Sequence, residues 1–210
     1  MKLGKIINST AKIFLHVIFP VQCPVCENPA EIICDECLKN LFQDENIIFR
    51  DTKNLKIYVA SKYEDNIKKI IHELKYKNSK LLGYKLGCEI AKLFERPNVN
   101  YLVPVPLHID STRKYNQAYE IARGLGHVWN IKIFNETAWT KIVQRRALLG
   151  VAERKLLSED AFKITGDLNN LKISIVDDVC TTGTTLLKFS QACKNSGALV
   201  ESAYTVAGTQ

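Results

Sequence analysis

The sequence predicts an α/β protein with a mainly parallel sheet and flanking helices, preceded by a small four-cysteine module. Strand-like and helix-like segments alternate after residue 50, and four of the seven cysteines lie between Cys23 and Cys37. A chain of 210 residues allows one sizeable core and one appendage. We therefore expect a module over residues 1–50 and an α/β domain over residues 51–210.

The first elements of the α/β domain follow the module directly. Residues 57–63 are rich in β-branched and aromatic side chains, which favours a strand. The next apolar residues have the i, i+3, i+4, i+7 spacing of an amphipathic helix. They are Ile67, Ile70, Ile71 and Leu74. A second helical stripe covers residues 82–93.

The remaining elements continue this alternation. Residues 101–103 predict a short buried strand, and residues 117–129 predict a helix. Residues 172–176 predict a further strand, Gly183 opens a helix, and residues 198–206 predict the last strand. Because strands and helices alternate, we expect a mainly parallel sheet.

Charge and hydropathy limit the classes of partner. The formal net charge of +7, from 29 basic and 22 acidic residues, favours polyanionic partners. The apolar segment of residues 13–19 is too short to cross a bilayer, and no small-residue cleavage site follows it. We interpret it as an amphipathic helix that docks on the body. We expect a soluble, cytoplasmic protein with no membrane span.

The cysteine pairs predict a structural metal centre. Cys23 and Cys26 form one C-x2-C pair, and Cys34 and Cys37 form a second. Four thiolates complete a tetrahedral Zn²⁺ shell with no position left for water, and metal binding would stabilise a module too short to build its own core. The alternative is two disulfides, which require an oxidising compartment.

The other cysteines have simpler interpretations. Cys88 and Cys193 lie in helical patterns, where a thiol packs as a small hydrophobe. Cys180 lies in a hydroxyl-rich turn, and we interpret it as structural too, with a reactive thiol as the alternative.

The most informative segment covers residues 173–185, where an apolar strand ends in two acids and a hydroxyl-rich turn then opens a helix. Backbone N–H groups at a helix N-terminus bind phosphate, and Gly183 permits close backbone approach. The carboxylates of Asp177 and Asp178 accept hydrogen bonds from a ribose diol or hold a hydrated Mg²⁺ ion. The alternative is that the acids cap the turn and the threonines satisfy the helix end.

This segment resembles the phosphoribosyl pyrophosphate (PRPP) motif of type I phosphoribosyltransferases. The resemblance implies that fold, and it implies that Asp177 and Asp178 contact the ribose hydroxyls of PRPP with Mg²⁺. The 5-phosphate would bind the loop that follows. That loop consists of Thr181, Thr182, Gly183, Thr184 and Thr185.

Other segments are similar to the ComF family. They are the cysteine pairs after Phe19-Pro20, Leu74-Lys75-Tyr76, Val103-Pro104-Val105-Pro106, Arg113-Lys114-Tyr115-Asn116-Gln117-Ala118, and Arg154 placed before Phe162. The chain departs from the family where Lys114 replaces a glycine, where Leu157 replaces an asparagine, and where Thr140 and Gln144 fit only loosely.

The ComF resemblance implies a role in natural transformation, with single-stranded DNA handled at the cytoplasmic side. It implies PRPP, single-stranded DNA and a helicase or translocase of the uptake machinery as partners. The cations that would line a groove for the DNA backbone are Arg113, Lys114, Arg123, Arg145, Arg146, Arg154 and Lys155.

Two other functions stay open at this stage. An active phosphoribosyltransferase would use Asp177 and Asp178 with Arg113 and Lys114 to displace pyrophosphate, and Lys75 is a weaker candidate. A docking adaptor would use the zinc module alone. Three aromatic side chains near these segments either stack on a nucleobase or fill the core, namely Tyr76, Tyr115 and Trp139. We expect a core position for Trp139.

Overall fold

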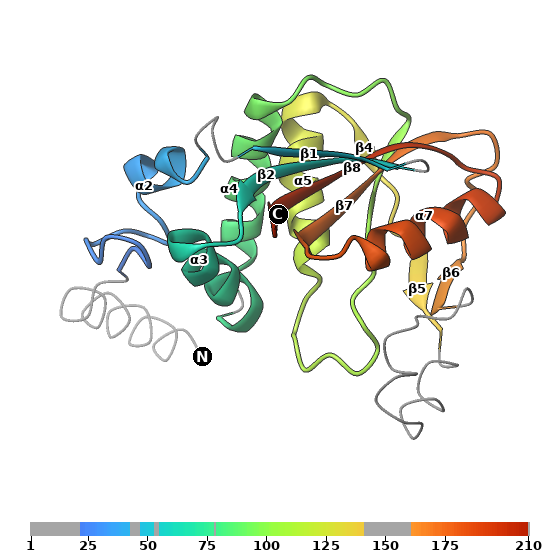
Figure 1. Cartoon of the computed structure of the whole chain (residues 1–210). Coiled ribbons are helices and arrows are strands. Elements are labelled where there is room, and N and C mark those ends of the chain that lie inside the picture. Colours follow the sequence, from blue (N-terminus) through green and yellow to red (C-terminus); the bar gives the residue numbers. More distant parts are fainter. Residues whose placement is uncertain (1–21, 43–46, 53–54, 78, 141–160, 210) are drawn as a thin grey trace, which may run out of the picture.

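The structure is a computed structural model, and it describes residues 22–42, 47–52, 55–77, 79–140 and 161–209. Figure 1 shows the cysteine module at one end of the α/β domain. Within the described residues, no helix is both long enough and apolar enough to cross a membrane. The predicted helix over residues 13–19 lies outside the described residues.

A six-stranded sheet forms the centre of the molecule, in the order β1-β2-β8-β7-β3-β4. Every neighbouring pair is parallel except β1 with β2. The strands are β1 (Ile48–Thr52), β2 (Leu55–Lys62), β8 (Leu199–Gly208), β7 (Lys172–Cys180), β3 (Tyr101–Pro104) and β4 (Lys132–Ile133). The predicted α/β class with a mainly parallel sheet is therefore confirmed.

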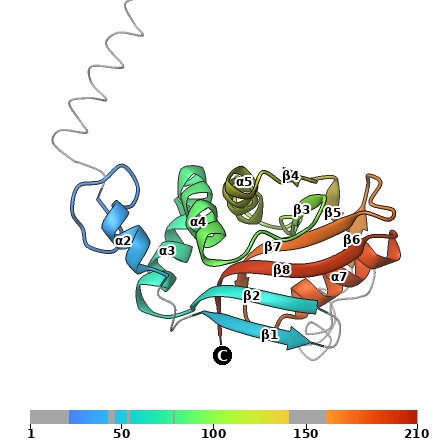
Figure 2. The same ribbon diagram turned by 90° about the horizontal axis from the view of Figure 1, so that it is seen from above.

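Helices cover both faces of this sheet. On one face lie α3 (Asp65–Tyr76), α4 (Lys80–Leu93) and α5 (Gln117–Trp129), which Figure 2 shows together on one side of the strands. They bury Leu102, Val176 and Tyr204 of the sheet. On the other face, α7 (Thr184–Asn195) packs with alternate residues of the same strands, such as Val103 and Ile175.

The sequence explains why α5 lies so close to α4. A Cβ atom at Gly87 would lie 2.1 Å from the carbonyl oxygen of Ile121, and one at Gly124 would lie 2.1 Å from that of Tyr84. Only glycine permits this approach of two backbones. The close packing fixes the position of α5, whose N-terminus belongs to the candidate site.

The structure also corrects and extends the predicted elements. The strand expected over residues 172–176 continues to Cys180, so both acids lie inside β7 and not after it. The predicted domain boundary near residue 50 falls within β1, which pairs with β2 of the sheet. The short strands were not predicted, nor was the helix α2 of the cysteine module. They are α2 (Asp35–Asn40), β1, β4, β5 (Thr137–Trp139) and β6 (Phe162–Ile164).

Candidate functional site

The topology singles out the carboxyl ends of β3 and β7. These strands are parallel neighbours, but β3 continues through α5 to β4 on one side, and β7 continues through α7 to β8 on the other. The two helices lie on opposite faces. In open α/β sheets such a switch of direction opens a crevice where ligands bind.

The unequal lengths of the two strands shape this crevice. The last residue of β3, Pro104, pairs with Val176, whereas β7 runs on through Asp177 and Asp178. Val105 donates one more backbone hydrogen bond to Val176, at 2.9 Å. The chain then leaves the sheet, so both acids lie beside the gap that β3 no longer fills.

Asn116 holds the chain after β3 in place. Its Nδ2 donates to the carbonyl oxygen of Val105 at 2.9 Å, and its Oδ1 accepts from the backbone N–H of Tyr119 at 3.3 Å. Asn116 is thus the N-cap of α5 and also ties α5 to the end of β3.

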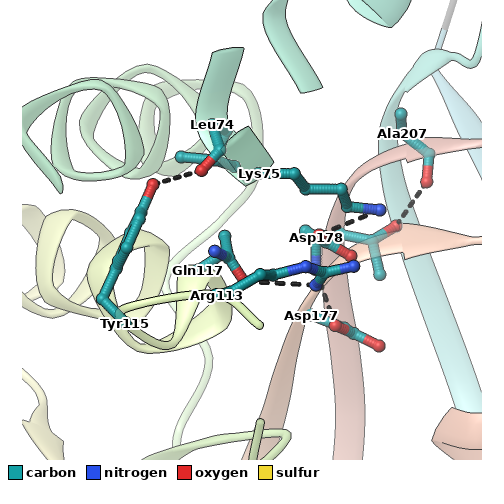
Figure 3. Close-up of polar contacts among 9 residues, drawn as sticks. Leu74, Lys75, Arg113, Tyr115, Gln117, Asp177, Asp178 and Ala207 are labelled. Atoms are coloured by element: carbon teal, nitrogen blue, oxygen red, sulfur yellow. Dashed lines mark hydrogen bonds and ion pairs between the residues drawn. The ribbon is translucent and has the colours of Figure 1, made fainter. Parts of the chain in front are cut away.

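The two acids have different surroundings (Figure 3). Asp177 is half-buried, and its Oδ1 accepts a hydrogen bond from the backbone N–H of Asp178 at 2.8 Å. Asp178 is only 8% exposed, and its Oδ2 lies 3.2 Å from Nζ of Lys75. That buried Oδ2 forms no hydrogen bond with the described residues, so the contact with Lys75 is one of charge. Asp178 therefore keeps capacity to accept a hydrogen bond or to bind a cation.

Burial and the neighbouring charge of Asp178 raise the pKa of Asp177 to about 8. The backbone hydrogen bond from Asp178 and the charges of Lys75 and Arg113 act in the opposite direction but do not cancel this rise. A bound cation would favour the ionised pair. The Mg²⁺ ion predicted from the sequence would take carboxylate oxygens such as these as ligands, and its binding here stays a prediction.

A cavity of about 140 Å³ opens beside the acids. Arg113, Gln117 and Thr185 line it, together with Trp139 and His108. A larger hollow of about 830 Å³ lies between the cysteine module and α3, but it contains neither the paired acids of β7 nor the hydroxyl-rich loop. Chemistry and not size therefore identifies the smaller cavity as the candidate site.

Trp139 has a role that the sequence did not predict. Its indole Nε1 donates to the carbonyl oxygen of Pro106 at 2.6 Å, and its ring lies 4.7 Å from that of His108 and 4.3 Å from that of Phe162. Trp139 is half-buried and lines the cavity, so the predicted core position describes only part of its surroundings. Tyr115 is buried, and Tyr76 is exposed on α3.

The hydroxyl-rich loop leads directly from β7 into α7. Gly183 is the N-cap of α7 with φ of +76°, a conformation that other residues rarely adopt. The Oγ1 atoms of Thr182 and Thr184 lie 2.9 Å apart, beside the first N–H groups of the helix. Thr182 Oγ1 also accepts from the backbone N–H of Thr184 at 3.4 Å, so a threonine contributes to the helix end, and the capping alternative for the two acids stays open. The loop presents N–H and O–H donors, which suit a phosphate.

Arg50 is a site residue that the sequence analysis missed. Its Nη1 donates to the carbonyl oxygen of Thr181 at 2.7 Å and lies 3.6 Å from Sγ of Cys180. Thr209 donates to the same carbonyl oxygen at 3.3 Å. Because Arg50 lies in β1, 131 residues before Thr181, no local pattern links the two. Arg50 braces the loop and adds positive charge beside it.

Of the cations predicted to act, two lie at the candidate site. Arg113 lines the cavity and donates from Nη1 to Oε1 of Gln117 at 3.2 Å, and Lys75 pairs with Asp178. Lys114 is exposed and does not line the cavity. Arg123 lies on α5 and pairs with Glu120 at 2.7 Å. The other four lie outside the described residues, namely Arg145, Arg146, Arg154 and Lys155.

The four module cysteines converge as expected for a metal centre. The sulfurs of Cys23, Cys26, Cys34 and Cys37 all lie within 4.8 Å of one another, and those of Cys26 and Cys34 are 3.7 Å apart. A tetrahedral Zn²⁺ site with Zn–S bonds of ~2.3 Å has S–S edges of about 3.8 Å. The four thiols therefore suit zinc, and each is a free cysteine in the structure.

The close spacing of these thiols affects their ionisation. Burial opposes ionisation of Cys23, but backbone hydrogen bonds from Cys26 and Cys34 lower the pKa of Cys23 to about 6. For Cys37, the hydrogen bond with the side chain of Cys34 raises the pKa, and burial raises it further. Four thiolates at this spacing require a positive charge among them.

The cysteines outside the module are structural. Cys193 is buried in the core under α7, and burial raises the pKa of its thiol to about 12. Burial also raises the pKa of Cys88 and of Cys180, which disfavours the reactive thiolate form at both positions. The structural interpretation of Cys180 is favoured.

We predict that Cys37→Ser removes zinc from the protein. Three thiolates hold the ion less tightly than four, so zinc content measured by mass spectrometry should fall to background, and the melting temperature should fall as well. Cys88→Ser is the control and should retain zinc. A zinc-free native protein whose mass is lower by the hydrogens lost in two disulfides would contradict the prediction.

We also predict that Asp177→Asn stabilises the protein at alkaline pH. Because the pKa of Asp177 rises from 3.8 to about 8 on folding, the folded chain binds more protons than the unfolded chain in this window. The free energy of unfolding therefore falls as pH rises through it. Because Asp177 is only half-buried, solvent screening leaves a fraction of the free energy that this shift implies. At pH 8 the variant should melt about 2–4 °C above the wild type, as expected for ~1 kcal/mol in a chain of this size.

The melting temperature as a function of pH checks this second prediction. The difference between variant and wild type should shrink toward pH 5, where Asp177 is protonated in the folded protein. Asp51→Asn, at an exposed position of β1, is the control. A difference that is constant with pH would exclude titration of Asp177 as the cause.

Comparison with known proteins shows no matching family model and no matching curated protein. Among solved structures, the chain is similar to a purine phosphoribosyltransferase from Pyrococcus horikoshii Ot3. The two share 17% sequence identity, with 65% of this chain and 85% of that chain covered, at a TM-score of 0.36. A likeness this distant assigns no residue, so the site rests on its own geometry.

Proposed function

We propose that this protein binds PRPP with Mg²⁺ at the carboxyl ends of β3 and β7, as a phosphoribosyltransferase-type protein does. One observation carries the proposal. Paired acids beside a cavity are followed at once by a hydroxyl-rich loop at a helix N-terminus, while Lys75 of α3 pairs with Asp178 and Arg113, from the segment after β3, lines the same cavity. Acids for a diol, donors for a phosphate and cations for a diphosphate are thus close together.

Each group of PRPP has a complementary partner in this arrangement. The 5-phosphate fits the N–H and O–H donors of residues 181–185, with the positive charge of Arg50 behind the loop. The ribose hydroxyls fit Asp177 and Asp178. Mg²⁺, when bound, would neutralise charge between the acids and the diphosphate. Lys75 and Arg113 would bind the diphosphate oxygens by charge-assisted hydrogen bonds.

A catalytic version of this function would displace pyrophosphate from C1 of the ribose by an acceptor. Trp139 supports it, because its ring lines the cavity next to the acids and is held in place by Pro106. An aromatic wall suits a planar acceptor such as a nucleobase. Pyrophosphate release that requires a particular acceptor would distinguish the enzyme from a protein that only binds PRPP.

The role in DNA uptake stays a prediction of the ComF resemblance. Among the described residues, Arg113 lines the candidate site and Arg123 forms an ion pair with Glu120. The salt dependence of single-stranded DNA binding tests this role, because neutralised phosphates release counterions. If neither DNA nor PRPP binds, the docking adaptor becomes the favoured function.

We predict that the wild-type protein binds PRPP with Mg²⁺ saturably in a calorimetric titration. The Asp177→Asn, Asp178→Asn double variant should bind more than about tenfold more weakly, because each lost charge-assisted hydrogen bond contributes ~1.5–3 kcal/mol. Asp51→Asn should bind like the wild type. The proposed function would be refuted if folded, zinc-loaded wild-type protein gave no heat of binding on titration with PRPP and Mg²⁺.

Arg50→Met should weaken PRPP binding by about fivefold, equivalent to ~1 kcal/mol. Methionine keeps most of the packing volume but donates nothing to Thr181, so the loop loses its brace and its nearby charge. Lys56→Met, at an exposed position of β2, is the matched control. Equal affinities for Arg50→Met and the wild type would show that the loop needs no support from β1.

A further inference from the structure

The C-terminal turn of α3 is held from a distance by Tyr115. The phenolic O–H of Tyr115 donates a hydrogen bond to the carbonyl oxygen of Leu74 (Figure 3). Tyr115 belongs to the segment between β3 and α5, 41 residues further along the chain. It is only 7% exposed, and burial raises its pKa to about 12. The hydroxyl is therefore protonated and a donor at any physiological pH.

The carbonyl group that Tyr115 contacts is one that the helix itself leaves unpaired. The last four carbonyl groups of an α-helix have no intrahelical partner, and in α3 these belong to residues 73–76. The backbone N–H of Lys77 satisfies Glu73 at 3.0 Å. Leu74 is fully buried, so water cannot replace the phenol easily. The contact ties down a helix end that would otherwise fray.

The residue directly after Leu74 is Lys75, whose Nζ lies 3.2 Å from Asp178. A lysine side chain is long and flexible, so its place depends on where its backbone is held. If the last turn of α3 unwinds, Lys75 moves away from the acid. A residue that holds this helix end would therefore act on the site through Lys75.

Gln117 accepts a hydrogen bond from Arg113, the second cation of the site. Arg113 has only donors, so the Gln117 oxygen must face it and the amide nitrogen must face the other way. Figure 3 shows Gln117 between Arg113 and Tyr115. The segment 113–117 therefore presents Arg113 to the cavity on one side and Tyr115 to α3 on the other.

We propose that Tyr115 is a positioning residue, whose hydroxyl holds the last turn of α3 so that Lys75 reaches Asp178. The functional half of this inference rests on the proposed binding of PRPP. The structural half does not, because it concerns the place of Lys75 in the protein without ligand.

The test compares Tyr115→Phe with the wild type by two measurements. The first is the rate at which an acetylating reagent labels Lys75, followed by peptide mass spectrometry, without any ligand. Labelling should be about threefold to tenfold faster in the variant, because a lysine released from its ion pair is more accessible. Lys92, paired with Glu89 at 2.6 Å on α4, is the internal reference and should not change.

The second measurement is a double-mutant cycle for binding of PRPP with Mg²⁺. Tyr115→Phe and Lys75→Met should each weaken binding, but the double variant should bind no more weakly than Lys75→Met alone, since both changes remove the same contact. Tyr204→Phe is the control, because it also removes a buried hydroxyl, at 3% exposure, from a residue of β8.

The outcomes separate this inference from the proposed function. Faster labelling of Lys75 with a non-additive cycle supports it. Unchanged labelling overturns it, as does a cycle in which the two losses multiply. If the wild type fails to bind PRPP, the proposed function fails, and the labelling rate still decides whether Tyr115 positions Lys75.

Discussion

The placement of two adjacent carboxylates at the end of one strand is the constraint on which the site depends. Successive residues of a strand point to opposite faces, so the side chains of Asp177 and Asp178 start from opposite faces of the sheet. Asp178 lies on the side of α3, where Lys75 meets it. Burial, followed by the neighbouring charge of Asp178, raises the pKa of Asp177, and the charges of Lys75 and Arg113 offset this rise only in part.

The strand lengths make this charge accessible. If β3 were as long as β7, its backbone and side chains would cover the acids. Instead β3 ends at Pro104, and the chain turns toward α5, where the side chain of Asn116 holds it by a hydrogen bond to Val105. Proline cannot donate a ladder hydrogen bond, so Pro104 and Pro106 favour this early end. The crevice therefore follows from two prolines and one capping side chain.

Local patterns predicted the parts of the fold that depend on local physics. The helix over residues 117–129 has the predicted bounds, and the four apolar residues predicted to form the buried stripe of α3 are all buried. The spacing of the cysteine pairs correctly predicted that their sulfurs converge. Short edge strands such as β1 and β4 carry too few residues to show a period, and the patterns missed them.

The same distinction holds for the site. The motif in β7 and its loop lies in one stretch of sequence, so Asp177, Asp178 and Gly183 could be identified by pattern. Arg50 and Tyr115 act on carbonyl groups far along the chain, and nothing in their own neighbourhoods indicates those contacts. The sequence also ranked two lysines in the wrong order. It favoured Lys114, which is exposed, over Lys75, which pairs with Asp178.

The metal centre and the candidate ligand site share one helix. Cys23, Ile33 and Leu38 of the module belong to the same apolar cluster as the buried stripe of α3. In a module this short, a bound metal would hold these side chains in place. The C-terminal turn of α3 carries Lys75, which pairs with Asp178. The helix that packs against the module therefore also places a cation at the candidate site. A metal bound by the four cysteines would thus support α3, the helix whose last turn Tyr115 contacts at the carbonyl oxygen of Leu74.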